Sequence, residues 1–184
     1  MGVSLWRDLS DDHQRTLSRG FLNFSPAELT ELTEDDFYLF AQWIYGREHR
    51  QMATSFVVCT GGADFTYEFA DGSREFLRVY PNERVPVVWL HDVLETVKRE
   101  KYKKIRIYMR AEKGKAAKNL QGEFPLILEV VDIEGLHHRL VDEQRRFQKT
   151  RFEKELNRAQ TKIGKANPLL FLIGKIKSSL LRRG

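Results

Sequence analysis

The chain has 184 residues, of which 41% are hydrophobic and 31% are charged. This composition can build a buried core and excludes a wholly disordered chain, and the length fits one compact domain with appendages or two very small domains. A single cysteine, Cys59, excludes a disulfide framework and any zinc site made of several cysteines.

The net charge of +5 hides a strong polarity along the chain. Residues 1–97 carry 8 Lys and Arg against 16 Asp and Glu, a net charge of −8, whereas residues 98–184 carry 23 against 10, a net charge of +13. A basic half of this strength indicates a polyanionic partner. Two hypotheses follow for the acidic half: it meets the basic arm of a neighbouring copy, or it shields the basic face until nucleic acid displaces it.

No targeting segment is evident in the sequence. The first residues lack the basic stretch and apolar run of a secretory signal, and the longest apolar stretch, 169–173, is far shorter than the roughly 20 residues of a membrane span. We therefore expect an intracellular, cytoplasmic protein.

The N-terminal part, residues 1–50, is expected to be an acidic helical segment. Ser25-Pro26-Ala27-Glu28 forms a capping box, and Thr33 followed by three acids predicts a second helix start. The helix from Asp36 to about Tyr45 should end near Gly46. Its many aromatic residues predict either core packing or an interface for a partner peptide.

Residues 51–135 change to a strand-like period. The predicted strands are 55–59, 64–69, 74–80, 101–110 and 124–133, with a helix over 90–101 and a polar loop over 112–122. The order β-β-β-α-β-β favours an α+β fold with a mostly antiparallel sheet. A two-residue turn at Asp71-Gly72 would place Glu68 opposite Glu75, an unfavourable pair unless a cation binds there or the strands slip.

Residues 136–184 are expected to form a basic C-terminal arm with an amphipathic tail. A long polar helix over 136–164 ends at Gly164, and its apolar positions 152, 156, 159 and 163 follow a heptad-like spacing. Asn167-Pro168 begins a last helix whose apolar and basic residues suit docking on its own domain or on a second copy, a partner groove, or an anionic membrane surface.

Motifs for catalysis are not found. The sequence has no phosphate-binding glycine loop and no nucleophile elbow, and the adjacent His137 and His138 splay apart on a helix. Asp64 and Glu68 lie too far apart along a strand to share one ion. We expect no enzymatic activity, no cofactor and no metal.

The strongest pattern is basic and aromatic. In the predicted strand 101–110, Ile105, Ile107 and Met109 point one way, and the opposite face suits phosphates and stacked bases. A polar loop and the long helix extend this basic track. The predicted nucleic-acid-binding residues are Tyr102, Lys104, Arg106, Tyr108, Arg110, Lys113, Lys115, Lys118, Arg145, Arg146, Lys149 and Arg151. A similar face is predicted for the hairpin residues Phe65, Tyr67, Phe69, Arg74, Phe76 and Arg78.

Each of these features has a plainer explanation. The strand rings would then be core residues, the lysine loop a solvated hairpin tip, and the helix a solvated face with a narrow apolar stripe. The sequence favours a nucleic-acid-binding protein that oligomerises through its C-terminal arm and works in plasmid or phage DNA processing, transcription control or packaging. DNA and RNA, and single strand and duplex, stay open. The alternative is an assembly, adaptor or matrix-type protein acting through the aromatic helix and the tail 168–184.

Overall fold

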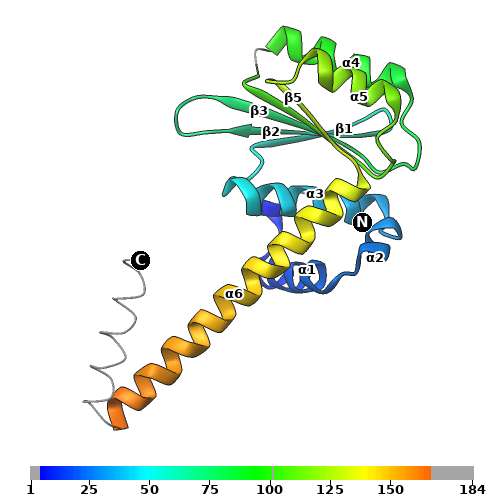
Figure 1. The fold of residues 1–184 in the computed structure, drawn as a ribbon. Helices are drawn as coiled ribbons and strands as arrows, with labels where there is room; N and C mark the ends of the chain where they lie inside the picture. The colour runs from blue at the N-terminus through cyan, green and yellow to red at the C-terminus, as the bar shows by residue number, and fades with distance from the viewer. Residues whose placement is uncertain (1–4, 101, 167–184) are drawn as a thin grey trace. The chain divides into compact units, whose positions relative to one another are not determined.

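The computed structural model describes residues 5–100 and 102–166 and has an α+β fold (Figure 1). A 3-10 turn, Trp6–Asp8, precedes the helices α1 (Asp11–Asn23), α2 (Pro26–Thr30) and α3 (Glu34–His49). The remaining elements are β1 (Ser55–Cys59), β2 (Gly62–Glu68), β3 (Arg74–Tyr80), α4 (Val87–Glu100), β4 (Lys104–Met109), α5 (Lys115–Glu123), β5 (Leu128–Val131) and α6 (Ile133–Ala166). The five strands form one sheet in the order of the chain.

The sheet is mixed. The pairings β1–β2 and β2–β3 are antiparallel, whereas β3–β4 and β4–β5 are parallel. The predicted α+β class is confirmed. The antiparallel residue pairs slightly outnumber the parallel ones, so the sheet is mostly antiparallel. The polar loop expected between the last two strands instead contains α5, because parallel neighbours need a crossover connection and the segment Lys115–Glu123 is rich in good helix formers.

Helix α3 begins as predicted and ends later than predicted. The Thr33 hydroxyl accepts a hydrogen bond from the Asp36 amide at 3.2 Å, and the helix runs through Gly46 to His49, where Arg50 takes a left-handed conformation with φ 53°. Its aromatic residues are buried, among them Phe37, Phe40, Trp43 and Tyr45. The core explanation is therefore confirmed, and the predicted partner-peptide interface on this helix is wrong.

The β2–β3 hairpin has a longer connection than predicted. Glu68 pairs with Arg74 and Tyr67 with Glu75, so the two glutamates do not face each other. Residues 69–73 close the hairpin through the bond from the Phe69 amide to the Ser73 carbonyl, 2.9 Å. With this register Phe65 and Tyr67 lie in one core and Phe76 in the other, which overturns the prediction that they share a face.

Two hydrophobic cores cover the two faces of the sheet. One core joins α1, α3 and the start of α6 to residues such as Phe65, Leu77 and Tyr108. The other joins α4 and α5 to residues such as Tyr80, Ile105 and Ile107. Figure 1 shows α4 and α5 over one face and α3 over the other. The alternation of β4 is thus confirmed, but both faces of the strand are covered.

The chain divides into two compact units, Met1–Val141 (the N-terminal unit) and Asp142–Gly184 (the C-terminal unit). The predicted segments 1–50 and 51–135 share one core inside the N-terminal unit. Helix α6 runs through Gly164, so that glycine does not end it as predicted. The predicted tail, 168–184, lies outside the described residues. No helix in the described ranges is both long and apolar enough to cross a membrane.

Candidate functional site

The predicted stacking platform on β4 is not present. The Tyr108 side chain is completely buried, and Tyr102 is only 8% exposed. Tyr102 packs against Phe76, with ring centroids 5.2 Å apart, and the Arg74 guanidinium lies 4.9 Å from its centroid. A buried ring offers no free face to a base, so the prediction that these tyrosines stack on nucleic acid is wrong.

Arg106, also predicted to contact phosphate, lies at the centre of a buried ionic network. Its side chain is 5% exposed and forms ion pairs with Glu75 of β3 and, at 2.9 Å, with Glu129 of β5. It also lies over the Tyr45 ring of α3, 5.2 Å from the centroid. Arg106 pairs with Glu129 in the β4–β5 ladder, so the parallel register brings these two charges together. The guanidinium is thus occupied within the protein and not free for phosphate.

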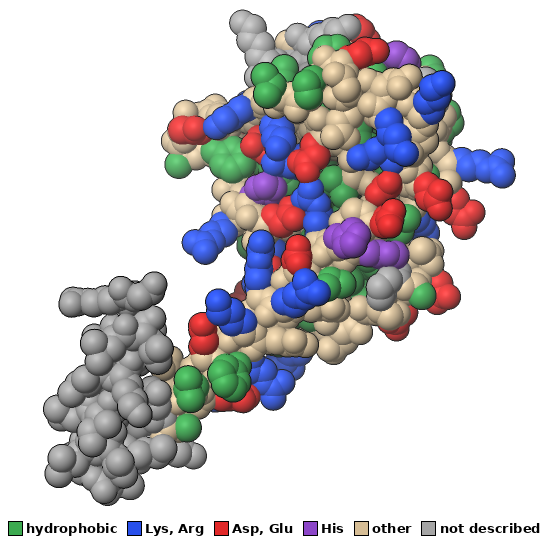
Figure 2. All heavy atoms as spheres, viewed as in Figure 1, with side chains coloured by type: hydrophobic (Ala, Val, Ile, Leu, Met, Phe, Trp, Pro, Cys, Tyr) green, Lys and Arg blue, Asp and Glu red, His purple; other side chains and the backbone are tan. Residues whose placement is uncertain are grey.

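The network continues from β5 to α3 and the first turns of α6. Arg139 of α6 forms ion pairs with Glu48 of α3 and, at 2.5 Å, with Glu129. It also donates to the Tyr108 hydroxyl at 3.1 Å. Lys104, the predicted neighbour of Arg106, contributes a further contact to Glu129 at 3.5 Å. Figure 2 shows acidic and basic side chains interspersed on this side of the N-terminal unit, with histidine beside them.

Burial and charge shift the titration of the network in opposite directions. Burial acts to raise the pKa of Glu129, but the charges of Arg139, Arg106 and Lys104 together hold it below its usual range. For Glu48, burial outweighs the attraction of Arg139 and raises its pKa. Burial and the nearby Arg106 charge lower the pKa of His49 to about 4. Burial and the neighbouring arginines therefore act against each other at both Glu129 and Glu48, and His49 stays neutral at pH 7.

This network is a structural link rather than an open chemical site. Every carboxylate in it is paired with at least one cation, so none is a free base. Asp64, which was considered above as a ligand for an ion, is paired with Arg78, whose Nη2 donates to it at 2.7 Å. No group of three or more His, Cys, Asp or Glu is placed to hold a metal ion among the side chains that the structure describes.

The sequence missed most members of the network, although one pattern pointed to it. Glu129 is the single charge in the apolar run 126–131, and a lone charge in a buried strand needs a partner. Its partners Arg106 and Arg139 lie in β4 and α6, and their other carboxylates, Glu75 and Glu48, lie in β3 and α3. No local sequence pattern connects these segments.

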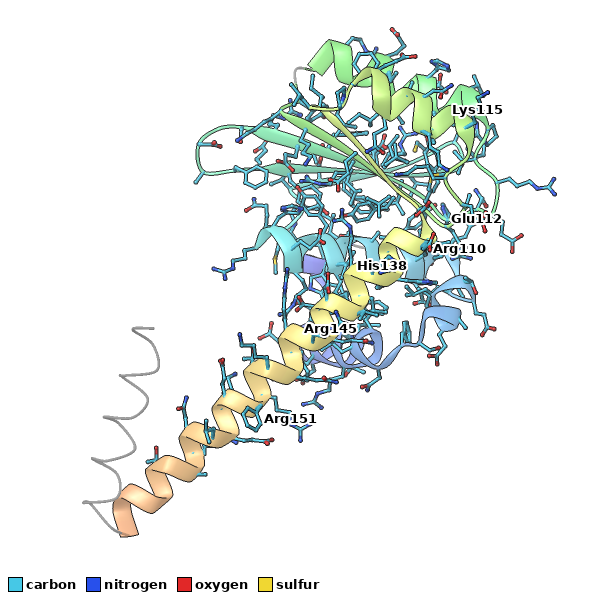
Figure 3. All side chains as sticks on the ribbon, viewed as in Figure 1. Arg110, Glu112, Lys115, His138, Arg145 and Arg151 are labelled. Carbon is cyan, nitrogen blue, oxygen red and sulfur yellow. The ribbon has the colours of Figure 1, made fainter. Side chains whose placement is uncertain are left out.

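The remaining predicted cations of the N-terminal unit differ in whether their side chains are held by hydrogen bonds or exposed to solvent. Arg110 donates to the Leu32 carbonyl at 2.6 Å and lies over the Phe37 ring. Lys113 donates to Gln121 at 3.0 Å, whereas Lys115 and Lys118 are exposed on α5. Figure 3 marks Arg110 after β4 and Lys115 at the start of α5.

The part of α6 in the C-terminal unit carries a group of exposed cations. Arg145, Arg146, Lys149 and Arg151 are all exposed, and Figure 3 marks the first and the last of them on α6. Arg145 and Arg146 contact Asp142 and Glu143 at 3.6 and 3.7 Å, and Arg151 contacts Glu155 at 3.0 Å. The Arg145–Asp142 and Arg151–Glu155 pairs are exposed, whereas Glu143 is buried beside an exposed Arg146. Pairs of this kind, three or four residues apart on a helix, leave the cations accessible.

This helix has two distinct faces. An α-helix turns about 100° per residue, so positions 147, 151, 154 and 158 lie along one face and positions 152, 156 and 159 along another. The first set, Phe147, Arg151, Lys154 and Arg158, is called the basic stripe below. The second, Phe152, Leu156 and Ala159, is the apolar stripe. Phe147, Phe152 and Leu156 are 42%, 66% and 46% exposed, and Figure 2 shows exposed hydrophobic side chains on this helix.

The charge polarity of the sequence coincides with the division into units. Residues 1–141 carry 19 Lys and Arg against 22 Asp and Glu, and residues 142–184 carry 12 against 4. The net charges are therefore −3 and +8. The basic excess of residues 98–141 is balanced inside the N-terminal unit, in part by the network around Arg106 and Arg139.

Comparison with known proteins gives little further information. No known family matches the chain, and no curated protein matches it. A solved structure of EndoMS in its apo form matches 60% of this chain and 47% of that chain, with 17% sequence identity and a TM-score of 0.33. A likeness this low carries no argument about fold or function.

Proposed function

We propose that the protein is a non-enzymatic nucleic-acid-binding protein whose contacts come mainly from the C-terminal unit. The observation that carries this proposal is the division of charge, −3 in residues 1–141 and +8 in residues 142–184. Phosphate backbones bind Lys and Arg through charge neutralisation and counterion release, without need for a shaped pocket. The Arg106 face predicted from the sequence has no part in this contact.

The basic stripe supplies the side chains for phosphate. Arg151, Lys154 and Arg158 follow one another at intervals of three and four residues, so they form a row of cations about 10 Å long. All three are exposed, and no acidic residue shares the row. Phe147 begins the row with an exposed ring that is suited to stack on a base.

The apolar stripe on the other face supports the second part of the proposal, oligomerisation through the C-terminal arm. Phe152 and Leu156 are large and exposed, and such residues at intervals of four and three are typical of helix pairing. A pairing on this stripe leaves the basic stripe open to nucleic acid.

The test is fluorescence anisotropy with labelled single-stranded DNA, duplex DNA and RNA, each over a salt series. The full chain should bind with a steep salt dependence. Replacing Arg151, Lys154 and Arg158 by Gln should reduce the slope of log K against log salt by roughly 2 to 3, because each lost phosphate contact removes about 0.7–0.9.

A matched control has the same change in charge. Arg7, Arg15 and Arg19 are exposed arginines of the N-terminal unit, and their replacement by Gln should leave the slope nearly unchanged. A third variant, with Gln at Lys113, Lys115 and Lys118, tests whether this predicted part of the track contributes. Equal losses in the stripe variant and the arginine control would reject the basic stripe as the binding surface.

A further inference from the structure

Strand β1 forms an edge of the sheet, and none of the other described strands pairs with its outer side. It is the first strand of the order β1-β2-β3-β4-β5 and pairs only with β2 in that order. Its register with β2 is continuous from Ser55 to Cys59, without a bulge. Val57 and Val58 point to opposite faces of the strand, and each is 60% exposed. Both faces beside this edge are therefore open.

The usual protection against strand pairing is missing here. Natural edges carry charged residues, proline or bulges that prevent another strand from adding to the sheet. Residues 51–63 contain no charged residue and no proline, although 31% of the whole chain is charged. The opposite edge differs, because three residues of β5 are buried and Glu129 is held in the ionic network.

We propose that β1 pairs antiparallel with β1 of a second copy of this chain, around a twofold axis at Val57. Charge complementarity points to this occupant. A charged side chain opposite β1 would find no countercharge, so the edge fits an uncharged strand. Among the strands that the structure describes, β1 is the one that carries no charge. In a twofold pairing the same segment must complement itself, and an uncharged strand does so without any like-charge pair.

The pairing has a defined register. With Val57 opposite its own symmetry copy, Phe56 faces Val58 and Ser55 faces Cys59 of the second copy. The two sheets then join into one. A ladder of five residues buries far less than the roughly 1,600 Å² of a standard interface, so the dimer should be weak and dependent on concentration. This proposal does not depend on nucleic-acid binding.

The first test is sedimentation velocity of the full chain without nucleic acid, over a concentration series that reaches about 1 mM. Every chain in this test carries Phe152→Gln and Leu156→Gln at two exposed positions, so that pairing on the apolar stripe does not contribute. This parent chain should shift towards a dimer as concentration rises. Val57→Lys places two cations opposite each other and should keep the chain monomeric. Val88→Lys, at a position of α4 that is 59% exposed, makes the same change away from the edge and should leave the dimer intact.

Two results overturn the proposal: a parent chain that stays monomeric over the series, and a dimer that survives Val57→Lys. The second result would indicate that the copies meet on a surface other than β1 and the apolar stripe.

The register is tested by disulfide formation in a Cys59→Ser background. Residues directly opposite in antiparallel strands have Cα atoms about 4.5–5.5 Å apart, within the range of a disulfide. Val57→Cys should therefore cross-link readily under mild oxidation. Val58→Cys is the matched control, because its symmetry copy lies two residues out of register, at about 8 Å. Equal cross-linking of the two variants, or none with Val57→Cys, contradicts the proposed pairing.

Discussion

At the scale of single residues, the main finding is that cations suited to phosphate are used inside the protein. Arg106 and Arg139 neutralise Glu75, Glu129 and Glu48 across α3, three strands and α6. The acidic and basic halves of the sequence thus meet within one chain. This is a third outcome beside the two that the charge polarity suggested, contact with a neighbour and shielding of a nucleic-acid face.

The structure predicts unequal losses for two neighbouring cations of β4. Arg106→Met removes the arginine that pairs with the buried Glu75, leaves the Tyr45 hydroxyl 2.7 Å from that carboxylate, and should lower the free energy of unfolding by about 3 kcal/mol or more. Lys104→Met removes a contact whose lysine side chain is 37% exposed and should cost less than about 1 kcal/mol. Urea unfolding followed by circular dichroism measures both. Equal losses would mean that burial does not determine how much each ion pair contributes to the free energy of unfolding.

His49 gives the fold a defined response to acid. Its pKa is about 4 in the folded protein because of burial and the Arg106 charge, against about 6.5 in the unfolded chain. Between these values the unfolded chain binds more protons, so the free energy of unfolding falls as the pH decreases from about 6.5 to about 4. His49→Gln should make this part of the pH dependence shallower.

The measurement is the urea midpoint at a series of pH values. His138→Gln, at an exposed position of α6, controls for the loss of a histidine as such. A His49→Gln variant with the same acid dependence as the wild type would show that other groups of the network carry the effect.

At the scale of the elements, the sequence predicted most helices and strands but not how the last strands pair. Hydrophobic periodicity and capping residues located α3, β1, β2, β3 and α4, because these signals depend on neighbouring residues. The parallel pairing of β4 and β5 depends on the helix between them, and the lysine-rich composition of Lys115–Glu123 resembles a solvated loop. The predicted nucleic-acid-binding face of β4 was wrong for a related reason. Alternation predicts which face a residue takes, but not whether a helix covers that face.

The two hairpin turns permit a controlled test of packing. Gly61 and Gly72 both have a positive φ, 74° and 77°. A methyl group at Gly72 meets no atom within 4 Å, whereas one at Gly61 would overlap the Trp89 ring of α4. Gly72→Ala should therefore cost only the backbone strain of about 1 kcal/mol.

Gly61→Ala should lose about 1–3 kcal/mol more, because it also displaces Trp89 from beside Tyr80. The melting temperatures of the two variants measure the difference. Equal melting temperatures would show that the contact between the β1–β2 turn and Trp89 contributes nothing to stability.

At the scale of the whole molecule, folding and polyanion binding are assigned to different units. Residues 1–141 contain both cores, the sheet and the complete ionic network, whereas residues 142–184 contain the basic excess. A chain that ends at Val141 should therefore unfold cooperatively with intact strands and helices. It should also lose binding to DNA and RNA, since its net charge is −3.

Circular dichroism and anisotropy on the same truncated sample check these two expectations. Retained binding with an unchanged salt slope would place the nucleic-acid surface in the N-terminal unit. A truncated chain that does not fold would show that the C-terminal unit also supports the core.

The ionic network has a consequence for how the chain is made. A ribosome synthesises Tyr45, Glu48 and Glu75 well before Arg106, Glu129 and Arg139, and these first residues belong to a half with a net charge of −8. At 5–20 residues per second, several seconds pass between the synthesis of the carboxylates in the acidic half and the synthesis of the arginines that neutralise them. Final packing must therefore follow the synthesis of residue 139. A messenger that is cut or stalled before that codon yields a product that cannot complete its core, and cellular proteases should remove it rapidly.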